Sequence, residues 1–216
     1  MPIPSHDDTD RVLSTLSDLS GRLDLATLHV YVHEILDWNP DLGLVSRRDT
    51  PTVLAGLIRQ SIDFWDLVVK TCTVDTESWR VADIGSGAGF PGVVWRLLAP
   101  GLELVLVERK RRRAVFLERV VRRIGLSGIQ VVEADLNELP TRDAYRNTFD
   151  LAVMLAVAPP GRVAAAVEAL LVDNGCFGTL RRGPGRTVDT TLGRSLTLTA
   201  QRTTDAGTFV LYHKSL

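Results

Sequence analysis

The residues best suited to chemistry form a glycine-rich segment in the middle of the chain, from Val81 to Gly92. A short apolar run there is followed by three glycines in a G-x-G-x-G spacing. Glycines permit a tight turn and let a ligand approach the backbone closely. The helix that is expected to follow offers free N–H groups at its N-terminus. A strand, a glycine loop and a helix in this order are typical of a nucleotide-binding turn.

The spacing of the glycines separates two kinds of ligand. A dinucleotide loop has the pattern G-x-G-x-x-G, but this chain has Phe90 where that pattern needs its third glycine, and the glycine comes one residue earlier, at Gly89. The pattern G-x-G-x-G, preceded by Asp83, is typical of the S-adenosylmethionine (SAM) loop of class I methyltransferases. SAM has no pyrophosphate, so the loop must accommodate its amino-acid part and ribose. We expect Asp83 to contact the ammonium group of SAM directly or through water.

Acidic residues further along the chain complete the expected cofactor site. Glu108 ends the second apolar run, where an acid accepts the ribose hydroxyls in dinucleotide folds. Residues 133–136 end the third run, where such folds place a group near the adenine. The expected cofactor-binding residues are Asp83, Gly85, Ser86, Gly87, Gly89, Phe90, Glu108, Arg109, Asp135 and Leu136. The alternative is that the glycines form only a tight turn and that Glu108 is a solvated strand end.

The apolar pattern predicts the elements that position this loop. From Arg80 onward, short apolar runs alternate with amphipathic stretches, which indicates parallel strands joined by helices. The expected strands are 81–84, 104–107, 129–132, 151–154 and 177–180, and the expected helices are 92–98, 111–123 and 162–171. Stretches 195–201 and 208–213 are joined by Thr-Asp-Ala-Gly, which predicts an antiparallel hairpin.

The N-terminal third has the spacing of helices. Apolar residues recur at helical intervals between Arg11 and Trp38 and are interrupted at Gly21, so we expect two helices, the second ending at 39–41. A third helix is expected over 53–69, and the polar residues 1–9 are expected to be frayed. We therefore expect an N-terminal helical cap over 1–74. The rest, 75–216, is expected to form an α/β SAM-binding core, a class I, Rossmann-like methyltransferase sheet with a C-terminal antiparallel hairpin.

Composition sets limits on the class of protein. The chain has 216 residues, of which 45% are hydrophobic and 24% charged, which suits one α/β domain with an appended helical segment. No apolar run reaches the roughly 20 residues that span a bilayer, and the start does not have the pattern of a signal peptide. The cysteines are Cys72 and Cys176 alone, which excludes a disulfide scaffold. We expect a cytoplasmic protein with no membrane partner, and the two cysteines as small apolar residues.

Metal and nucleic-acid sites have weak sequence signals. His29 and His33 are four residues apart but lack a third ligand, so a plain helix face is expected and no metal site is predicted. The net charge is −1, so nucleic-acid binding would depend on a local basic patch. Residues 109–113 form such a patch, and Arg119, Arg122 and Arg123 continue it along the expected helix. The patch is interpreted either as phosphate contact or as a solvated helix face.

Residues 28–181 resemble a known family, the bacterial small-subunit (16S) ribosomal RNA guanine-N7 methyltransferases, also called the glucose-inhibited division protein B family. The resemblance rests on three groups of residues. These are Asp83 to Gly92 with their Pro-Gly ending, Arg112-Arg113 with Phe116-Leu117, and Trp38-Asn39 ahead of Leu44. The resemblance implies that the chain methylates a guanine of ribosomal RNA with SAM as cofactor.

The chain departs from this family where the substrate should lie. The family has Arg-Ala-Phe-Ala after the fourth strand, but this chain has Leu155-Ala-Val157-Ala, so a guanidinium is lost. In the cap, the family's His…Asp-Ser pattern is matched by Leu57, Gln60 and Ser61. A later Lys-Gly is matched by Arg181-Arg182, so a cation is retained there. The candidate substrate-pocket residues are Leu155, Val157, Arg181 and Arg182, and no catalytic residue is assigned.

The expected chemistry leaves three alternatives. Methyl transfer is an in-line displacement that depends on alignment, and residues 154–160 contain no His, Asp, Glu or Lys. These facts favour a nitrogen nucleophile, which needs no general base. The acceptor is then a small amine or heterocycle, or guanine N7 in the ribosomal RNA of the 30S subunit; a non-catalytic SAM-binding protein is the third alternative. The lost arginine and the near-neutral charge lead us to expect the small-molecule acceptor in preference to RNA.

Overall fold

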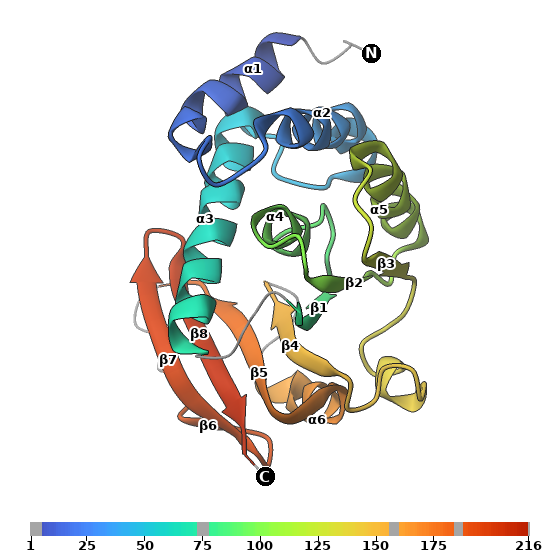
Figure 1. Cartoon of the computed structure of the whole chain (residues 1–216), viewed down its shortest axis with the longest axis vertical. Coiled ribbons are helices and arrows are strands. Elements are labelled where there is room, and N and C mark those ends of the chain that lie inside the picture. Colours follow the sequence, from blue (N-terminus) through green and yellow to red (C-terminus); the bar gives the residue numbers. More distant parts are fainter. Residues whose placement is uncertain (1–5, 73–77, 156–159, 184–187, 216) are drawn as a thin grey trace.

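The computed structural model describes residues 6–72, 78–155, 160–183 and 188–215, which form a central eight-stranded sheet between two layers of helices (Figure 1). The strands are β1 (Arg80–Ile84), β2 (Glu103–Val107), β3 (Ile129–Val132), β4 (Phe149–Met154), β5 (Leu171–Arg181), β6 (Thr191–Leu192), β7 (Leu196–Thr204) and β8 (Gly207–Lys214). The helices are α1 (His6–Thr15), α2 (Leu25–Leu42), α3 (Thr50–Thr71), α4 (Gly92–Leu98), α5 (Arg111–Ile124) and α6 (Pro160–Leu170), with 3-10 turns η1 (Ser17–Leu19) and η3 (Leu139–Thr141).

The sheet has the strand order β3-β2-β1-β4-β5-β8-β7-β6. Strands β3, β2, β1, β4 and β5 are parallel to one another, whereas β8 pairs antiparallel with both β5 and β7. The expected α/β sheet with a C-terminal antiparallel hairpin is therefore confirmed. The order reverses between β1 and β4, and such reversals in open parallel sheets create a crevice at the carboxyl ends of the strands.

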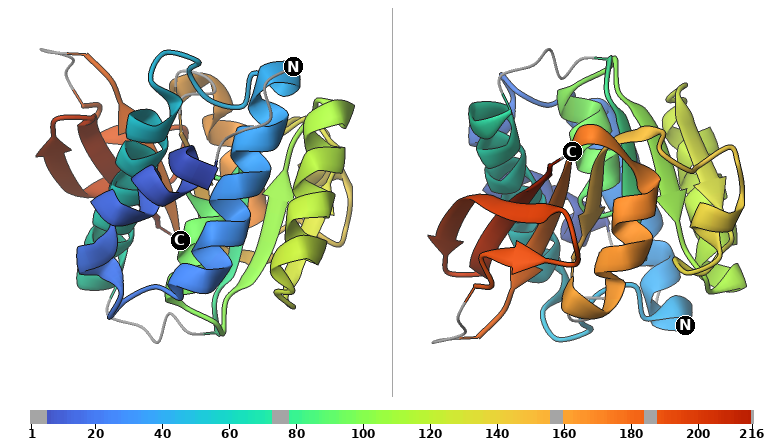
Figure 2. Two further views of the ribbon diagram at one scale, coloured as in Figure 1. Left: turned by 90° about the horizontal axis from the view of Figure 1, so that it is seen from above. Right: turned by 90° about the horizontal axis from the view of Figure 1, so that it is seen from below.

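Alternation along each strand divides the apolar residues between two cores. Leu104 and Leu106 belong to the core beneath α1–α5, whereas Val105 and Val107 belong to the core on the face covered by α6 and η3. Figure 2 shows α1 and α2 over the sheet in one view and α6 over it in the other. Strands buried on both faces read as largely apolar runs, which explains why the sequence pattern locates β1, β2 and β4 closely.

The N-terminal helices differ from expectation at two places. Residues 1–9 were expected to be frayed, but α1 begins at His6 and Thr9 is fully buried. Helix α2 was expected to end at 39–41, but it continues through Pro40 to Leu42. Proline removes one backbone donor, and it does not terminate this helix. The helix ends at Gly43, whose left-handed φ of 56° lets its N–H donate to the Asn39 carbonyl at 2.9 Å.

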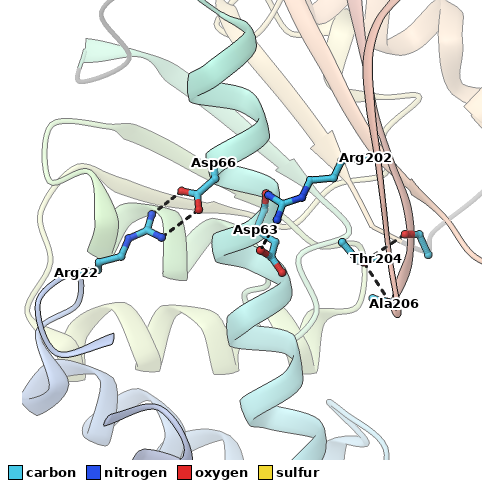
Figure 3. A network of polar contacts seen from close by, with 7 residues as sticks. Arg22, Asp63, Asp66, Arg202, Thr204 and Ala206 are labelled. Atoms are coloured by element: carbon cyan, nitrogen blue, oxygen red, sulfur yellow. Dashed lines mark hydrogen bonds and ion pairs between the residues drawn. The ribbon is translucent and has the colours of Figure 1, made fainter. Parts of the chain in front are cut away.

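Helix α3 is held between the other N-terminal helices and the sheet by polar contacts on two sides. Asp66 forms an ion pair with Arg22, and Asp63 forms one with Arg202 of β7 (Figure 3). The Trp95 indole of α4 donates to the Ser61 carbonyl at 2.7 Å. These contacts set the position of α3, which faces the carboxyl ends of the parallel strands. The expected boundary between residues 74 and 75 lies outside the described residues, and the division into cap and core stays a prediction.

Candidate functional site

A cleft of about 560 Å³ lies at the carboxyl ends of the parallel strands. Its floor comes from the turns after β1, β2 and β3 and from the end of β4, and residues from α3 and α5 lie around it. The lining residues are Leu44, Val45, Leu57, Gln60, Ile84, Gly85, Ser86, Gly87, Ala88, Phe90, Val107, Glu108, Arg109, Lys110, Arg113, Ala134, Asp135, Leu136, Asn137, Leu155, Val163 and Arg182. Clefts of this size are typical of small-molecule and cofactor sites.

Most of the residues predicted from the sequence come together in this cleft. The expected cofactor residues that line it are Gly85, Ser86, Gly87, Phe90, Glu108, Arg109, Asp135 and Leu136, and the expected substrate residues are Leu155 and Arg182. Asp83, Gly89 and Arg181 are not among the lining residues. Arg181 instead forms an ion pair with Asp189 at 2.6 Å. Val157 lies outside the described residues.

Two of the loop glycines, Gly87 and Gly89, have different surroundings. Gly87 has φ +57°, and a Cβ there would meet nothing closer than 3.8 Å, so this position is open towards the cleft. At Gly89, φ is +102°, and a Cβ would come within 2.8 Å of a Val93 methyl and 2.9 Å of the Tyr31 hydroxyl. The same hydroxyl donates to the Ala88 carbonyl at 2.9 Å. Gly89 therefore lets the loop pack against α2, whereas Gly87 leaves space for a ligand.

Asp83 lies behind the loop and is only 1% exposed. Its Oδ2 accepts from the Gly92 N–H at 3.1 Å, while Oδ1 is buried without a partner. Burial raises the pKa of Asp83 to about 8. A Cβ on Gly92 would come within 2.8 Å of that carboxyl oxygen, so the glycine is needed for the contact. Asp83 thus anchors the start of α4, and its predicted contact with the SAM ammonium group stays a prediction.

Glu108 connects the end of β2 to the glycine loop. Its Oε2 accepts from the Gly87 N–H at 3.1 Å, and its Oε1 accepts from the Lys110 N–H at 2.8 Å. Each carboxylate oxygen has a second lone pair that remains available to a hydroxyl in the cleft. After β3, the Asp135 Oδ1 accepts from the Asn137 backbone and side-chain N–H groups at 3.0 and 2.9 Å. The two acids are thereby oriented on one side of the cleft.

The acceptors and the space in this cleft suit SAM. Gly87 is open to the ligand, and Glu108 has free acceptor capacity beside it. Ala134 and Leu136 supply apolar surface for an adenine, and Asp135 supplies an acceptor beside them. The orphaned Oδ1 of Asp83 is an additional polar group beneath the loop that a bound ligand or water can satisfy.

The structure changes the interpretation of the basic patch. Arg119 and Arg123 were grouped with a phosphate-binding face, but their Nε atoms donate to the Glu34 carboxylate of α2 at 2.6 and 3.1 Å. Arg113 donates to the Gly43 carbonyl at 2.7 Å. These three arginines therefore fasten α5 to α2. The sequence pattern alone did not single out Glu34, although an acid among the apolar residues of α2 was a signal for it.

The described residues contain no cluster of three or more His, Cys, Asp or Glu that could hold a metal ion. The Nδ1 atom of His33 lies 3.3 Å from the Oδ2 atom of Asp37 in the next turn of α2. Within the described ranges, no helix has the length and apolar character needed to cross a membrane.

The strand order and the G-x-G-x-G turn define the class: this is the class I methyltransferase fold, with a loop of the SAM-binding type and a carboxylate after β2. The family model described as GidB, rRNA small subunit methyltransferase G, matches residues 24–187, and the chain belongs to this family. The resemblance seen in the sequence is thereby confirmed.

Named relatives support the family assignment, and one solved structure supports the fold. The chain is 43% identical over 143 residues to Ribosomal RNA small subunit methyltransferase G of Symbiobacterium thermophilum, covering 64% of this chain and 55% of that protein. It is 28% identical over 182 residues to the protein of the same name in Moorella thermoacetica, covering 82% and 73%. A SAM dependent methyltransferase from Aquifex aeolicus has the same fold, with a TM-score of 0.55 and 13% identity, covering 73% of this chain and 93% of that chain.

The aligned part of the chain spans about half the length of the Symbiobacterium protein and of other relatives with the same name. The Symbiobacterium and Moorella relatives both carry the name of a ribosomal RNA methyltransferase. They favour the RNA alternative, and the expected preference for a small-molecule acceptor finds no support among them.

Proposed function

We propose that the chain transfers the methyl group of SAM to N7 of a guanine in the ribosomal RNA of the small subunit. The observation that carries this proposal is the Glu108 carboxylate, which lines the cleft and accepts from the Gly87 N–H of the SAM-type loop. Family membership and the names of the relatives support RNA as the substrate. The 30S subunit is then the partner, and the cytoplasm is the place of action.

The cofactor residues have separate roles in this proposal. When bound, SAM supplies a methyl group made electrophilic by its sulfonium. Glu108 accepts hydrogen bonds from the ribose hydroxyls, and Asp135 and Leu136 contact the adenine. The turn around Gly87 accommodates the amino-acid part, and Asp83 holds that turn through Gly92.

The acceptor end of the cleft has to align a base rather than deprotonate it. Guanine N7 carries a lone pair and no proton, so its attack on the methyl carbon requires orientation and exclusion of water. Leu57 and Leu155 give this end an apolar wall. The described lining residues include no His, Cys or Tyr, and the two lining acids are assigned to the cofactor. The arrangement therefore suits a nucleophile that needs no general base.

Exposed cations beside the cleft are suited to the RNA backbone. Arg109 and Lys110 follow β2, Arg182 follows β5, and all three are exposed while lining the cleft. Arg112 is exposed on the first turn of α5. Such cations bind phosphates and position a nucleic acid without reading its sequence. Arg182 is the cation that compensates for the family's arginine, which is absent at Leu155.

The proposal is tested with labelled SAM and 30S subunits from a bacterium that lacks the N7-methyl group. The RNA is digested after the reaction, and its nucleosides are separated by mass. We expect label in 7-methylguanosine and none with subunits that already carry the methyl group. Glu108→Ala serves as the cofactor-site control and should transfer little label.

Two other outcomes would contradict the proposal in different ways. Label confined to a soluble metabolite extract would indicate a small-molecule methyltransferase. SAM binding without label in either fraction would indicate a non-catalytic protein.

A further inference from the structure

Two cysteines that are 104 positions apart in the chain meet in the structure. Cys72 is the C-terminal cap of α3, and Cys176 lies in β5, paired with Leu151 of β4 and His213 of β8. Their sulfur atoms are 3.4 Å apart, and both thiols are free. A disulfide requires about 2 Å between the sulfurs, so a side-chain adjustment of little more than 1 Å would bring the thiols to bonding distance.

The two thiols differ in exposure and acidity. Cys72 is half-buried at the end of its helix, whereas Cys176 is 6% exposed within the sheet. A hydrogen bond from the Cys176 thiol lowers the pKa of Cys72, and the same interaction together with burial raises the pKa of Cys176. Cys72 is therefore suited to react first with an oxidant, and Cys176 is suited to react second.

We propose that Cys72 and Cys176 form a redox-sensitive pair that closes into a reversible disulfide when the protein meets a hydroperoxide. This proposal does not depend on the proposed function. Cysteines in reducing compartments that form transient disulfide bonds are commonly redox sensors. Cys72 and Cys176 are free thiols that lie close enough to form such a bond.

The reaction balances in two steps. The Cys72 thiolate attacks the peroxide oxygen, an S–O bond forms, the O–O bond breaks, and the departing alkoxide or hydroxide takes up a proton. Cys72 is then a sulfenic acid, oxidised by two electrons, while the peroxide is reduced. The Cys176 sulfur next attacks the Cys72 sulfur, the S–S bond forms, and the S–O bond breaks. The leaving hydroxide takes the Cys176 proton and departs as water. A cellular dithiol reverses the bond by exchange.

The bond would fasten two parts of the molecule that both reach the cleft. Helix α3 carries Leu57 and Gln60 of the cleft wall, and β5 leads directly to Arg182. A covalent link between the end of α3 and β5 would hold the N-terminal helices to the sheet without using any residue assigned to the cofactor. The oxidised and reduced proteins are therefore both expected to fold.

The test treats the full reduced chain with hydrogen peroxide, unfolds it in guanidinium chloride, and then alkylates all remaining thiols, including the otherwise buried Cys176, with iodoacetamide. Intact mass and peptide mapping show which thiols are left. We expect the loss of both free thiols, a linked Cys72–Cys176 peptide pair, and recovery of both thiols with dithiothreitol. In the folded chain, linkage should be at least about tenfold faster than in guanidinium chloride, because folding raises the effective concentration of one thiol at the other.

Two single variants provide matched controls. In Cys176→Ser, we expect a sulfenic acid at Cys72 that dimedone captures, and in Cys72→Ser we expect Cys176 to stay alkylatable. Circular dichroism of both variants checks that they fold. The proposal is overturned if both thiols of the folded parent remain alkylatable after peroxide, or if linkage is no faster in the folded chain than in denaturant.

Discussion

At the scale of single residues, the site depends on a few side chains whose tasks are separated by their geometry. Glu108 is joined to the loop through Gly87, and Asp83 is joined to α4 through Gly92. The first acid faces the cleft, and the second is enclosed behind the loop. Substitutions of Glu108 and Asp83 are therefore expected to have different effects, although both acids lie near the end of a strand.

Glu108→Gln should weaken SAM binding by about 1–3 kcal/mol, because the ribose hydroxyls lose a charged acceptor. Isothermal titration calorimetry measures the change in Kd. Glu103→Gln, at the exposed start of the same strand, is the control and should bind SAM as the parent does. An unchanged Kd in the Glu108 variant would remove this residue from the ribose role.

Gly87→Arg and Gly89→Ala should impair the protein in different ways, the first through SAM binding and the second through stability. The Gly87 variant is strained by its positive φ and should lose some stability, but it should remain folded and lose SAM binding, since its side chain enters open space at the cleft. The Gly89 variant should lose stability, because its Cβ would collide with Val93 and Tyr31 at a positive φ. Thermal unfolding and SAM titration of both variants separate the two effects. If the Gly87 variant bound SAM normally, this account of the loop would be wrong.

Asp83 should make stability depend on pH. Burial raises its pKa to about 8 in the folded state, so the folded protein holds a proton that the unfolded chain has lost above about pH 4. The contribution of Asp83 to stability is therefore fully present below about pH 4 and falls as the pH rises to about 8, by on the order of 2 kcal/mol between pH 6 and pH 8.

The measurement for Asp83 compares urea unfolding of the parent with that of Asp83→Asn at both pH values. Asparagine keeps the carbonyl that accepts from Gly92, but it does not ionise. The variant should therefore show a flatter pH dependence. Equal slopes in the two proteins would contradict the assignment to Asp83.

At the scale of elements, α2 and α5 are joined through Glu34, a buried acid of α2. The Glu34 side chain is 2% exposed, while Arg119 and Arg123 reach it from the solvent side. The Arg119 guanidinium also lies over the Trp38 ring, 5.6 Å from its centroid. This contact positions the segment after α2, which supplies Leu44 and Val45 to the cleft.

Glu34→Gln should destabilise the fold by about 1–3 kcal/mol, because charged hydrogen bonds between α2 and α5 are lost. The arginines are partly exposed, which keeps the loss below that of a fully buried pair. Urea unfolding measures the change, and a double-mutant cycle with Arg119→Gln isolates the coupling. Glu118→Gln, exposed on α5, is the control and should change stability little. Zero coupling in the cycle would show that the contact contributes nothing.

At the scale of the whole molecule, the charge distribution decides how an RNA would be held. The net charge is −1, so no general attraction to RNA is available. Cations gather at the carboxyl edge of the parallel strands, where Arg109, Lys110 and Arg182 border the cleft. The proposed binding to the 30S subunit is therefore expected at this edge.

Binding to 30S subunits should therefore weaken steeply with salt, and Lys110→Gln with Arg112→Gln should lower the slope of log K against log salt by about 1–2. Filter binding at several salt concentrations gives the slope. SAM affinity should stay the same in the double variant. Arg194→Gln, exposed at the far edge of the sheet, is the control. A slope equal to that of the parent would place the RNA elsewhere.

Much of the fold and of the cofactor site could be predicted from the chain itself. Strands β1, β2 and β4 are buried over most of their length and appear as largely apolar runs, and helices α4 and α5 lie within a residue of their predicted bounds. The loop from Asp83 to Gly92 indicates its ligand because glycine spacing reflects local backbone geometry. Pro40 misled the prediction of the end of α2, because a helix end depends on Gly43 beyond it as well as on the proline.

The sequence by itself determined the order of elements, the SAM-type loop, the acids at the strand ends and the family. These are local features, set by side-chain periodicity and by the backbone freedom of glycine. Only the tertiary structure decided that Asp83 lies behind the loop, that Arg119 and Arg123 bind Glu34, and that Cys72 meets Cys176. Each of these contacts joins segments far apart in the chain. Their distances follow from how the helices pack on the sheet, which no local pattern records.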